Sequence, residues 1–284
     1  MEKQILCGNG KALEVVTSSD ENFSLCYSEL GNEGITAEDM TMKKLAQAKL
    51  LAGDANNLWQ KGSWTTNGWI YVPSGDILVT APKYTPFLRN LDKAVAEHIA
   101  GRENYVNDEF QEIMDNAKTN PADAVKSGVL LLKRQGLRQD LETGSFGDMP
   151  VTYFLFEEIA QQYGSALGNK GIKSVRLILA SEDYAKHQNR PFSRALWAND
   201  LSSDSALYGS IILNYSGGRV SGVREQWRAE HADTPEGRRG AKIPIGNAGL
   251  AELTLEEVLA IVGEYTVGPN MEALQKKLAN RFRK

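Results

Sequence analysis

The amino-acid sequence predicts an α+β protein in which mixed sheet elements surround a central block of helices. Three observations lead to this fold class. Short apolar runs between Gly, Asn, Asp and Ser residues fill roughly the first 30 residues. A hairpin pattern follows at residues 69–80, and helical periodicity dominates residues 84–135. Residues 150–215 then combine helix and strand signals, which gives this stretch local α/β character.

The N-terminal segment is predicted to form a small meander of strands. Residues 13–16 and 23–27 are apolar runs bounded by turn-forming residues. A helix is predicted over residues 37–52, because acidic residues occupy its first turn and apolar residues recur at helical spacing as far as Gly53.

The clearest hairpin consists of two β-rich runs within residues 70–79, joined by a Pro-Ser-Gly-Asp turn. Three tryptophans, Trp59, Trp64 and Trp69, stand just before it. We interpret them as core residues, and the alternative is an aromatic surface that stacks on bases or sugars.

The helical block is expected to contain three helices. The first runs from Phe87 to Ile99, the second from Tyr105 to Ala117, and the third from Pro121 through Leu132 toward Gly136. Residues 136–149 have no usable period and are interpreted as a loop.

A boundary is predicted within that loop, which divides the chain into two regions. Residues 1–145 would form an N-terminal α+β region with the hairpin and the helical block. Residues 146–284 would form a more basic C-terminal α/β region, with a long Arg/Gly loop at 224–249 and two terminal amphipathic helices that start near Leu255 and Pro269.

Within the C-terminal region the elements are expected in the order helix, strand, helix, strand, strand. The first helix covers residues 151–167, and residues 172–180 form a buried strand. A helical stretch is predicted to begin at Pro191, followed by strands at residues 208–215 and 220–223.

Composition places the chain among folded proteins without a membrane partner. Its 284 residues are 42% hydrophobic and 24% charged, close to the average of globular chains. No apolar run approaches the roughly 18 residues that a spanning helix needs. The start of the chain lacks a secretory-signal pattern, so we expect a cytoplasmic protein with Cys7 and Cys26 as reduced thiols.

Charge is distributed unevenly along the chain. Residues 1–160 carry 15 Lys or Arg against 23 Asp or Glu, whereas residues 161–284 carry 17 against 13. A basic half can bind polyanions, and halves of opposite charge can also draw copies of one chain together into a homo-oligomer.

The best candidate binding segment lies in the basic half, because arginine holds phosphate in a fixed bidentate geometry and tryptophan can stack on a base. Acidic residues are interspersed in the same segment, and a salt-bridged, solvated loop is therefore the alternative interpretation. The residues predicted to contact nucleic acid are Arg219, Arg224, Trp227, Arg228, His231, Arg238, Arg239 and Lys242, together with Lys186, Arg190 and Arg194.

The sequence offers few signals for catalysis. It contains three histidines, of which His187 and His231 stand near acidic residues and could serve as general acids or bases. It has no nucleotide-binding glycine motif and no metal-ligand spacing, so we expect no cofactor and no metal.

Three functional hypotheses follow. The leading one is a non-enzymatic binding protein that contacts nucleic acid or another polyanion through its basic C-terminal half. The alternatives are a self-assembling structural subunit, such as a viral or cage-like shell protein, and an enzyme of unrecognised family that uses His187 or His231.

Overall fold

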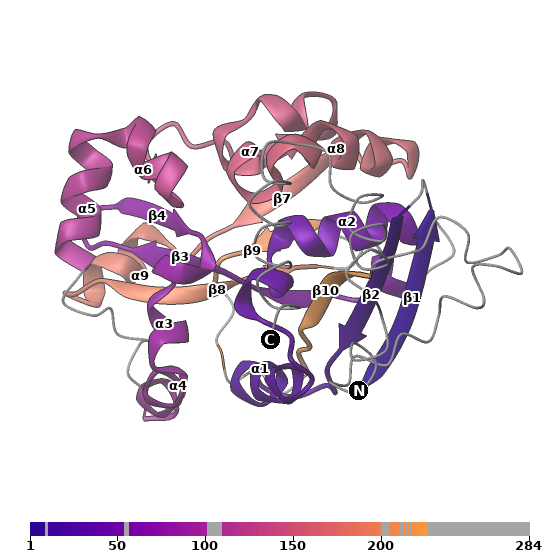
Figure 1. The fold of residues 1–284 in the computed structure, drawn as a ribbon. Coiled ribbons are helices and arrows are strands. Elements are labelled where there is room, and N and C mark those ends of the chain that lie inside the picture. Colours follow the sequence, from indigo (N-terminus) through magenta and orange to yellow (C-terminus); the bar gives the residue numbers. More distant parts are fainter. Residues whose placement is uncertain are drawn as a thin grey trace, which may run out of the picture. The chain divides into compact units, whose positions relative to one another are not determined.

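Two sheets and the helices that cover them make up the described part of the chain (Figure 1). A computed structural model describes residues 1–8, 11–53, 57–100, 110–199, 205–210, 213, 215 and 217–226. Contacts divide the chain into two units, Met1–Trp227 and Arg228–Lys284, and every described residue belongs to the first unit. The predicted α+β class is confirmed.

The smaller sheet is antiparallel and has β2 in its centre. Its strands are β1 (Glu2–Gly8), β2 (Lys11–Thr17) and β10 (Ser221–Gln226), in the order β1-β2-β10. In this register Val15 lies opposite both Gln4 and Val223. The sheet therefore joins the start of the chain to a strand more than 200 residues later.

The larger sheet has seven strands in the order β5-β4-β3-β8-β9-β7-β6. Neighbouring strands are antiparallel except for the parallel pair β7 and β9. Strands from before and after residue 145 share this sheet. Their bounds are β3 (Ser63–Tyr71), β4 (Asp76–Thr80), β5 (Val129–Lys133), β6 (Asp140–Glu142), β7 (Ser174–Ile178), β8 (Phe192–Ala198) and β9 (Ala206–Tyr208).

Helices cover both faces of the larger sheet. Side chains of α2, α7 and α8 pack with one face, and side chains of α1, α3, α4, α5 and α6 pack with the other in two further clusters. In Figure 1, α7 and α8 lie above the sheet, while α1, α3 and α4 lie below it. The bounds are α1 (Phe23–Asn32), α2 (Met42–Ala52), α3 (Pro86–Arg89), α4 (Leu91–Ile99), α5 (Phe110–Thr119), α6 (Pro121–Ser127), α7 (Pro150–Phe156), α8 (Ala160–Asn169) and α9 (Glu182–His187).

The three clustered tryptophans are core residues, as predicted. Trp59, Trp64 and Trp69 are all buried. Trp69 belongs to the cluster that α2, α7 and α8 cover, whereas Trp64 packs edge-on against Phe23 and Trp197 in the opposite cluster. The alternative of an exposed stacking surface is therefore wrong for these residues.

Several predicted elements are confirmed. The hairpin forms from β3 and β4, and the buried strand predicted over residues 172–180 is β7. The helix predicted over residues 37–52 is present as a 3-10 helix, Ala37–Met40, followed by α2. Gly53 ends α2 with a φ of 69°, a conformation that glycine adopts without strain. Both cysteines are free thiols, as expected.

The strand predicted at residues 23–27 is instead the first half of α1. The Asn22 side chain accepts a hydrogen bond from the Leu25 N–H and so caps the helix. Phe23, Cys26 and Leu30 then fall on one buried helix face. A short apolar run has the same appearance in a strand and in a buried helix, so only packing separates the two.

The third helix of the helical block is shorter than predicted. It is α6, and it ends at Gly128, whose φ of 103° stops the helix. The leucines after Gly128 form β5, which pairs with β4. The predicted loop at residues 136–149 contains β6 and a 3-10 helix, Thr143–Asp148.

Three predictions in the C-terminal region are also wrong or only partly right. The helical stretch expected from Pro191 is the strand β8, which is buried along its whole length because it lies in the middle of the sheet. The helix expected over residues 151–167 is interrupted after Phe156 and becomes α7 and α8. Of the strand expected at residues 208–215, only Tyr208 lies in a described strand, β9, and residues 211, 212 and 214 lie outside the described residues.

The late parts of the sequence prediction lie beyond the described residues. Most of the polar loop at residues 224–249 and both terminal helices fall there, as does the start of the helix expected from Tyr105. Across the part of the chain that is described, no helix has the length and apolar character needed to cross a membrane.

The contact between Gly218 and Trp64 gives a test of the packing. A Cβ atom at residue 218 would overlap the rigid Trp64 ring, so we expect Gly218→Ala to lower the free energy of unfolding by about 1–3 kcal/mol. Urea denaturation measures this change. Gly31→Ala in α1 is the control, because nothing lies within 4 Å of its added Cβ, and it should gain at most about 1 kcal/mol. Equal stability of the two variants would contradict the packing described here.

Candidate functional site

The two predicted cations on the smaller sheet are both paired with carboxylates. Arg219 stands just before β10, with Nη2 2.9 Å from Asp20 Oδ1 and only 15% of its side chain exposed. Arg224 Nε lies 2.5 Å from Glu14 Oε2, and Arg224 Nη1 donates a hydrogen bond to the Glu33 carbonyl at 3.2 Å. The hydrogen bond to Glu14 raises the pKa of Arg224. Neighbouring acids thus compensate both charges.

The three predicted cations around α9 and β8 have different surroundings. Lys186 in α9 pairs with Glu182 one turn earlier, at 2.7 Å. Arg190 lies exposed in the turn before β8. Arg194 is only 3% exposed within β8, and its guanidinium lies 5.3 Å from the centre of the Phe192 ring. Arg194 is therefore part of the interior and presents no charge to a large ligand.

These five cations do not gather on one surface. Arg224 lies on β10 and Lys186 on α9, and the two elements are well apart in Figure 1. The other residues predicted to contact nucleic acid lie outside the described part of the chain: Trp227, Arg228, His231, Arg238, Arg239 and Lys242. Binding of a polyanion by these residues stays a prediction.

The candidate catalytic histidines give no assembled site. His187 ends α9 and is exposed, with Nδ1 2.6 Å from the Asp183 carbonyl oxygen, which is a local contact within the helix. His231 lies outside the described residues. A search of the described residues gives no group of three His, Cys, Asp or Glu side chains arranged to hold a metal ion. Catalysis by His187 or His231 stays a prediction.

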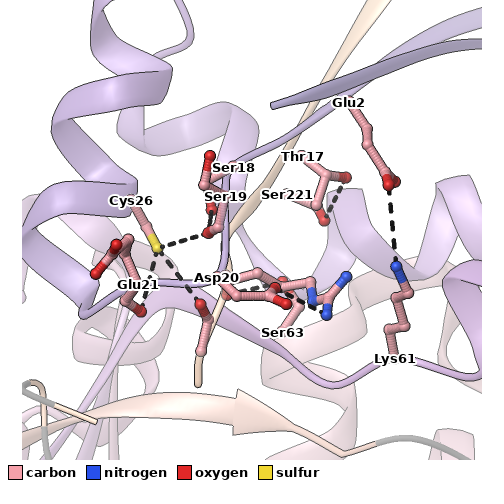
Figure 2. A network of polar contacts seen from close by, with 12 residues as sticks. Glu2, Thr17, Ser18, Ser19, Asp20, Glu21, Cys26, Lys61, Ser63 and Ser221 are labelled. Carbon is pink, nitrogen blue, oxygen red and sulfur yellow. Dashed lines mark hydrogen bonds and ion pairs between the residues drawn. The ribbon is translucent and has the colours of Figure 1, made fainter. Parts of the chain in front are cut away.

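A polar network lies where the smaller sheet meets α1 and β3 (Figure 2). Within it the Cys26 thiol is 3.5 Å from the carbonyl oxygens of Ser19 and Glu21, and the Thr17 and Ser221 hydroxyls are 3.1 Å apart. Burial is the main cause that raises the pKa of Cys26, so this sulfur stays a protonated thiol at neutral pH. We interpret the network as a structural tie.

A broad open groove between α2 and α7 is a candidate for a binding site. Its volume is about 930 Å³, and we call it the α2–α7 groove. The N-terminal half of α2 forms one wall, and α7 with the two glutamates that follow it forms the other. The segment after β4 and the end of α6 complete the lining.

The groove is lined by equal numbers of positive and negative side chains. The lysines are Lys43, Lys44, Lys83 and Lys126, and the glutamates are Glu38, Glu157, Glu158 and Glu225. One ion-pair cluster crosses from wall to wall, because Lys43 Nζ on α2 lies 2.7 Å from Glu157 and 2.9 Å from Glu158. The groove thus carries both signs of charge and little net charge.

The ion-pair cluster shifts the pKa values of Lys43 and Glu158. Burial acts to lower the pKa of Lys43, but the hydrogen bonds with Glu157 and Glu158 outweigh burial and raise it. The hydrogen bond from Lys43 lowers the pKa of Glu158. Lys43 and Glu158 are therefore both charged at neutral pH.

Two large apolar side chains are exposed on the lining of the groove. Tyr153 of α7 is 57% exposed, and Val125 of α6 is 37% exposed. Tyrosine combines a large apolar ring with a hydroxyl that can hydrogen-bond, which makes it a frequent residue in protein interfaces. The lining of the groove thus combines exposed apolar area with charged side chains of both signs.

The backbone beside the groove is strained at Glu157. This residue follows α7 with φ 51° and ψ −134°, a combination that non-glycine residues rarely adopt. Its N–H donates to the Tyr153 carbonyl, and its carboxylate binds Lys43. The turn at Glu157 ends α7 and directs two adjacent carboxylates toward α2.

Sequence reasoning missed this groove. Tyr153, Glu157 and Glu158 all fall inside the helix that periodicity predicts over residues 151–167. No turn-forming residue marks the interruption, and Glu157 itself is a good helix former. The one sequence signal of the interruption was the Glu157-Glu158 pair in an otherwise apolar stretch. In a continuous helix, the same pair would be interpreted as part of the solvent-exposed face.

Comparison with known proteins gives a match in fold. No family model matches the chain, and no curated protein matches it in sequence. The chain is similar to a solved structure from work on the accommodation of massive sequence variation in Nanoarchaeota by the C-type lectin fold. The two share 17% sequence identity with a TM-score of 0.52, and the match covers 76% of this chain and 99% of the other.

The Lys43 cluster predicts a pH dependence of stability. Because folding lowers the pKa of Glu158, its contribution is present above the ordinary value of 4.5 and is lost as pH falls through the folded value. Because folding raises the pKa of Lys43, its contribution is present below 10.5 and is lost as pH rises above that value. Lys43→Met should remove both pH dependences. It should lower the free energy of unfolding at pH 7 by no more than about 1 kcal/mol, because solvent screens the pair.

Urea unfolding at acidic, neutral and alkaline pH measures this effect. Lys126→Met is the control. Lys126 Nζ forms an ion pair with Asp123 at 3.4 Å on an exposed helix surface, where both side chains are solvated. If wild type and Lys43→Met lose stability in parallel on acidification, the cluster does not contribute as described.

Glu157 gives a test of backbone strain. Glycine adopts positive φ freely, and a strained non-glycine residue costs about 1–3 kcal/mol. Glu157→Gly should therefore raise the free energy of unfolding by about 1 kcal/mol, even though one carboxylate is lost from Lys43. Asn189→Gly is the matched control, because Asn189 also has positive φ, at 55°, but asparagine tolerates it. A thermal unfolding midpoint of Glu157→Gly below that of wild type would show that the turn is not strained.

Proposed function

We propose that this chain is a non-enzymatic binding protein that recognises a segment of another protein in the α2–α7 groove. The observation that carries the proposal is the exposed Tyr153 on a groove of about 930 Å³ whose walls present charges of both signs. An interface of this kind combines an aromatic anchor with polar groups that fix the register of the partner.

The charge balance favours a protein segment over a polyanion as the ligand of this groove. A polyanion is attracted by a net positive surface, and here four glutamates oppose four lysines. A peptide with both acidic and basic side chains can pair with both sets. Lys44 makes no side-chain hydrogen bond or ion pair with any described residue, so its ammonium is available to a ligand carboxylate.

The strained turn at Glu157 supports the same proposal. Backbone strain is concentrated at ligand-binding and catalytic sites, where the surrounding structure maintains it. Here the turn places Glu157 and Glu158 on the groove and within reach of Lys43. A helix that simply continued from α7 into α8 would carry these carboxylates in different directions.

The fold comparison supports a recognition role as well. The C-type lectin fold is described for the solved structure as one that accommodates massive sequence variation. A framework with that property can keep its core while its surface residues change. In this chain the core clusters of the larger sheet would form the constant framework, and the groove would carry the specificity.

The proposal is tested by selecting ligands for the full chain from a random-peptide phage library. We expect selected peptides to bind the wild-type chain and to lose about tenfold or more in affinity for Tyr153→Ser and for Val125→Asp, since aromatic anchors dominate interfaces. Leu25→Ser is the control, because Leu25 is similarly exposed on α1 and does not line the groove.

The same variants distinguish the polyanion hypothesis. Heparin and single-stranded DNA should not compete with the selected peptides. Peptides whose affinity is unchanged by both groove variants, or is abolished by heparin, would overturn the proposed function. Circular dichroism of each variant verifies that lost binding does not reflect unfolding.

A further inference from the structure

The strand β5 forms one edge of the seven-stranded sheet. It pairs with β4 on one side, and among the described strands none pairs with its other side. In an antiparallel ladder the N–H and C=O groups of alternate residues point to opposite sides. Alternate backbone groups of β5 therefore point away from β4, and an unpaired sheet edge of this kind can accept a further strand.

An apolar pocket opens beside the end of β5, with a volume of about 270 Å³, and we call it the β5 pocket. Leu132 of β5, Leu141 of β6 and Val151 of α7 form its apolar wall. The turn after β5 adds Leu137, and Met149 also lines the pocket. This volume is enough for one large apolar side chain.

The edge of β5 connects this pocket with the α2–α7 groove. The groove is lined by residues 125–128, directly before β5, and the pocket by Leu132 and Lys133 at its end. The start of α7 lines the pocket with Pro150 and Val151, and its later residues line the groove. A segment laid along β5 would therefore reach both cavities.

The charged side chains that line the β5 pocket are positive. Lys133 and Arg138 line it, and no acidic residue does so. Lys133 pairs with Asp76 at 2.9 Å, whereas Arg138 is exposed and makes no ion pair or hydrogen bond with any described residue. The exposed guanidinium of Arg138 can bind a ligand carboxylate in bidentate geometry.

We infer that the partner segment binds as an added eighth strand along β5, with a large apolar side chain in the β5 pocket and an adjacent carboxylate on Arg138. This inference rests on the proposed function and names its binding mode. Backbone hydrogen bonds to β5 would supply affinity, and the pocket with Arg138 would supply selectivity for an apolar residue beside Asp or Glu.

The occupant is a segment of a different protein, not β5 of a second copy. The five residues of β5, Val129–Lys133, contain no Asp or Glu. Pairing of β5 with itself would therefore bring no carboxylate of the added strand toward Arg138. Charge complementarity favours an acidic partner strand.

Amide hydrogen exchange on the full chain tests this binding mode, with the strongest groove-dependent peptide from the phage selection as the probe. We expect the outward-facing amides of β5 to exchange about tenfold more slowly, or slower still, when the peptide is bound. The same peptide with alternate backbone nitrogens methylated should lose this protection and bind more weakly, because it cannot complete the ladder.

The role of Arg138 is measured in parallel. Arg138→Gln should weaken peptides that carry Asp or Glu beside the apolar residue by roughly tenfold, the worth of one charge-assisted hydrogen bond. Lys173→Gln is the control, since Lys173 is an exposed cation that lines neither cavity.

The outcomes separate this inference from the proposed function. A peptide that binds in a groove-dependent manner but leaves β5 exchange unchanged would overturn strand addition and leave the proposed function standing. Selection that yields no groove-dependent peptide would overturn both.

Discussion

A two-residue insertion in β3 is the constraint on which the described structure depends. Between Thr65 and Gly68 the pairing with β8 advances by one residue, so Thr66 and Asn67 are extra. Asn67 Oδ1 accepts the Met42 N–H at 2.8 Å at the start of α2, and the Thr66 hydroxyl donates to the Ala37 carbonyl at 2.6 Å. Because two residues are inserted, side chains resume their original faces, and β3 fixes α2 over the sheet without disturbing the core.

The position of α2 in turn defines the candidate site. Lys43 lies in its first turn and binds the two glutamates that follow α7, so the ion pairs join the two walls of the groove. The interruption at Glu157 ends α7, whose first residues line the β5 pocket and whose later residues line the groove. The groove, the β5 pocket and the unpaired edge of β5 thus draw on neighbouring residues of β5 and α7.

The cations chosen from the sequence show why charge counting along a chain is a weak guide to a binding surface. Arg219 and Arg224 have carboxylate partners from residues about 200 positions away, and Arg194 lies inside the sheet. Their types and spacing were visible in the sequence, but their partners were not. The groove was not predicted from the sequence, because its residues come from α2, α6 and α7 and have no common motif.

The sequence by itself determined the features that depend on neighbouring residues. These include the β3–β4 hairpin with its turn, the glycine end of α2 and the burial of Trp59, Trp64 and Trp69, because turn chemistry, capping and hydrophobicity act locally. Tertiary structure decided the identity of α1 and β8, since an apolar run of five to seven residues suits a helix or a strand equally well. It also decided that β5 forms an edge and that Glu157 turns the chain, because both follow from contacts between residues far apart in sequence.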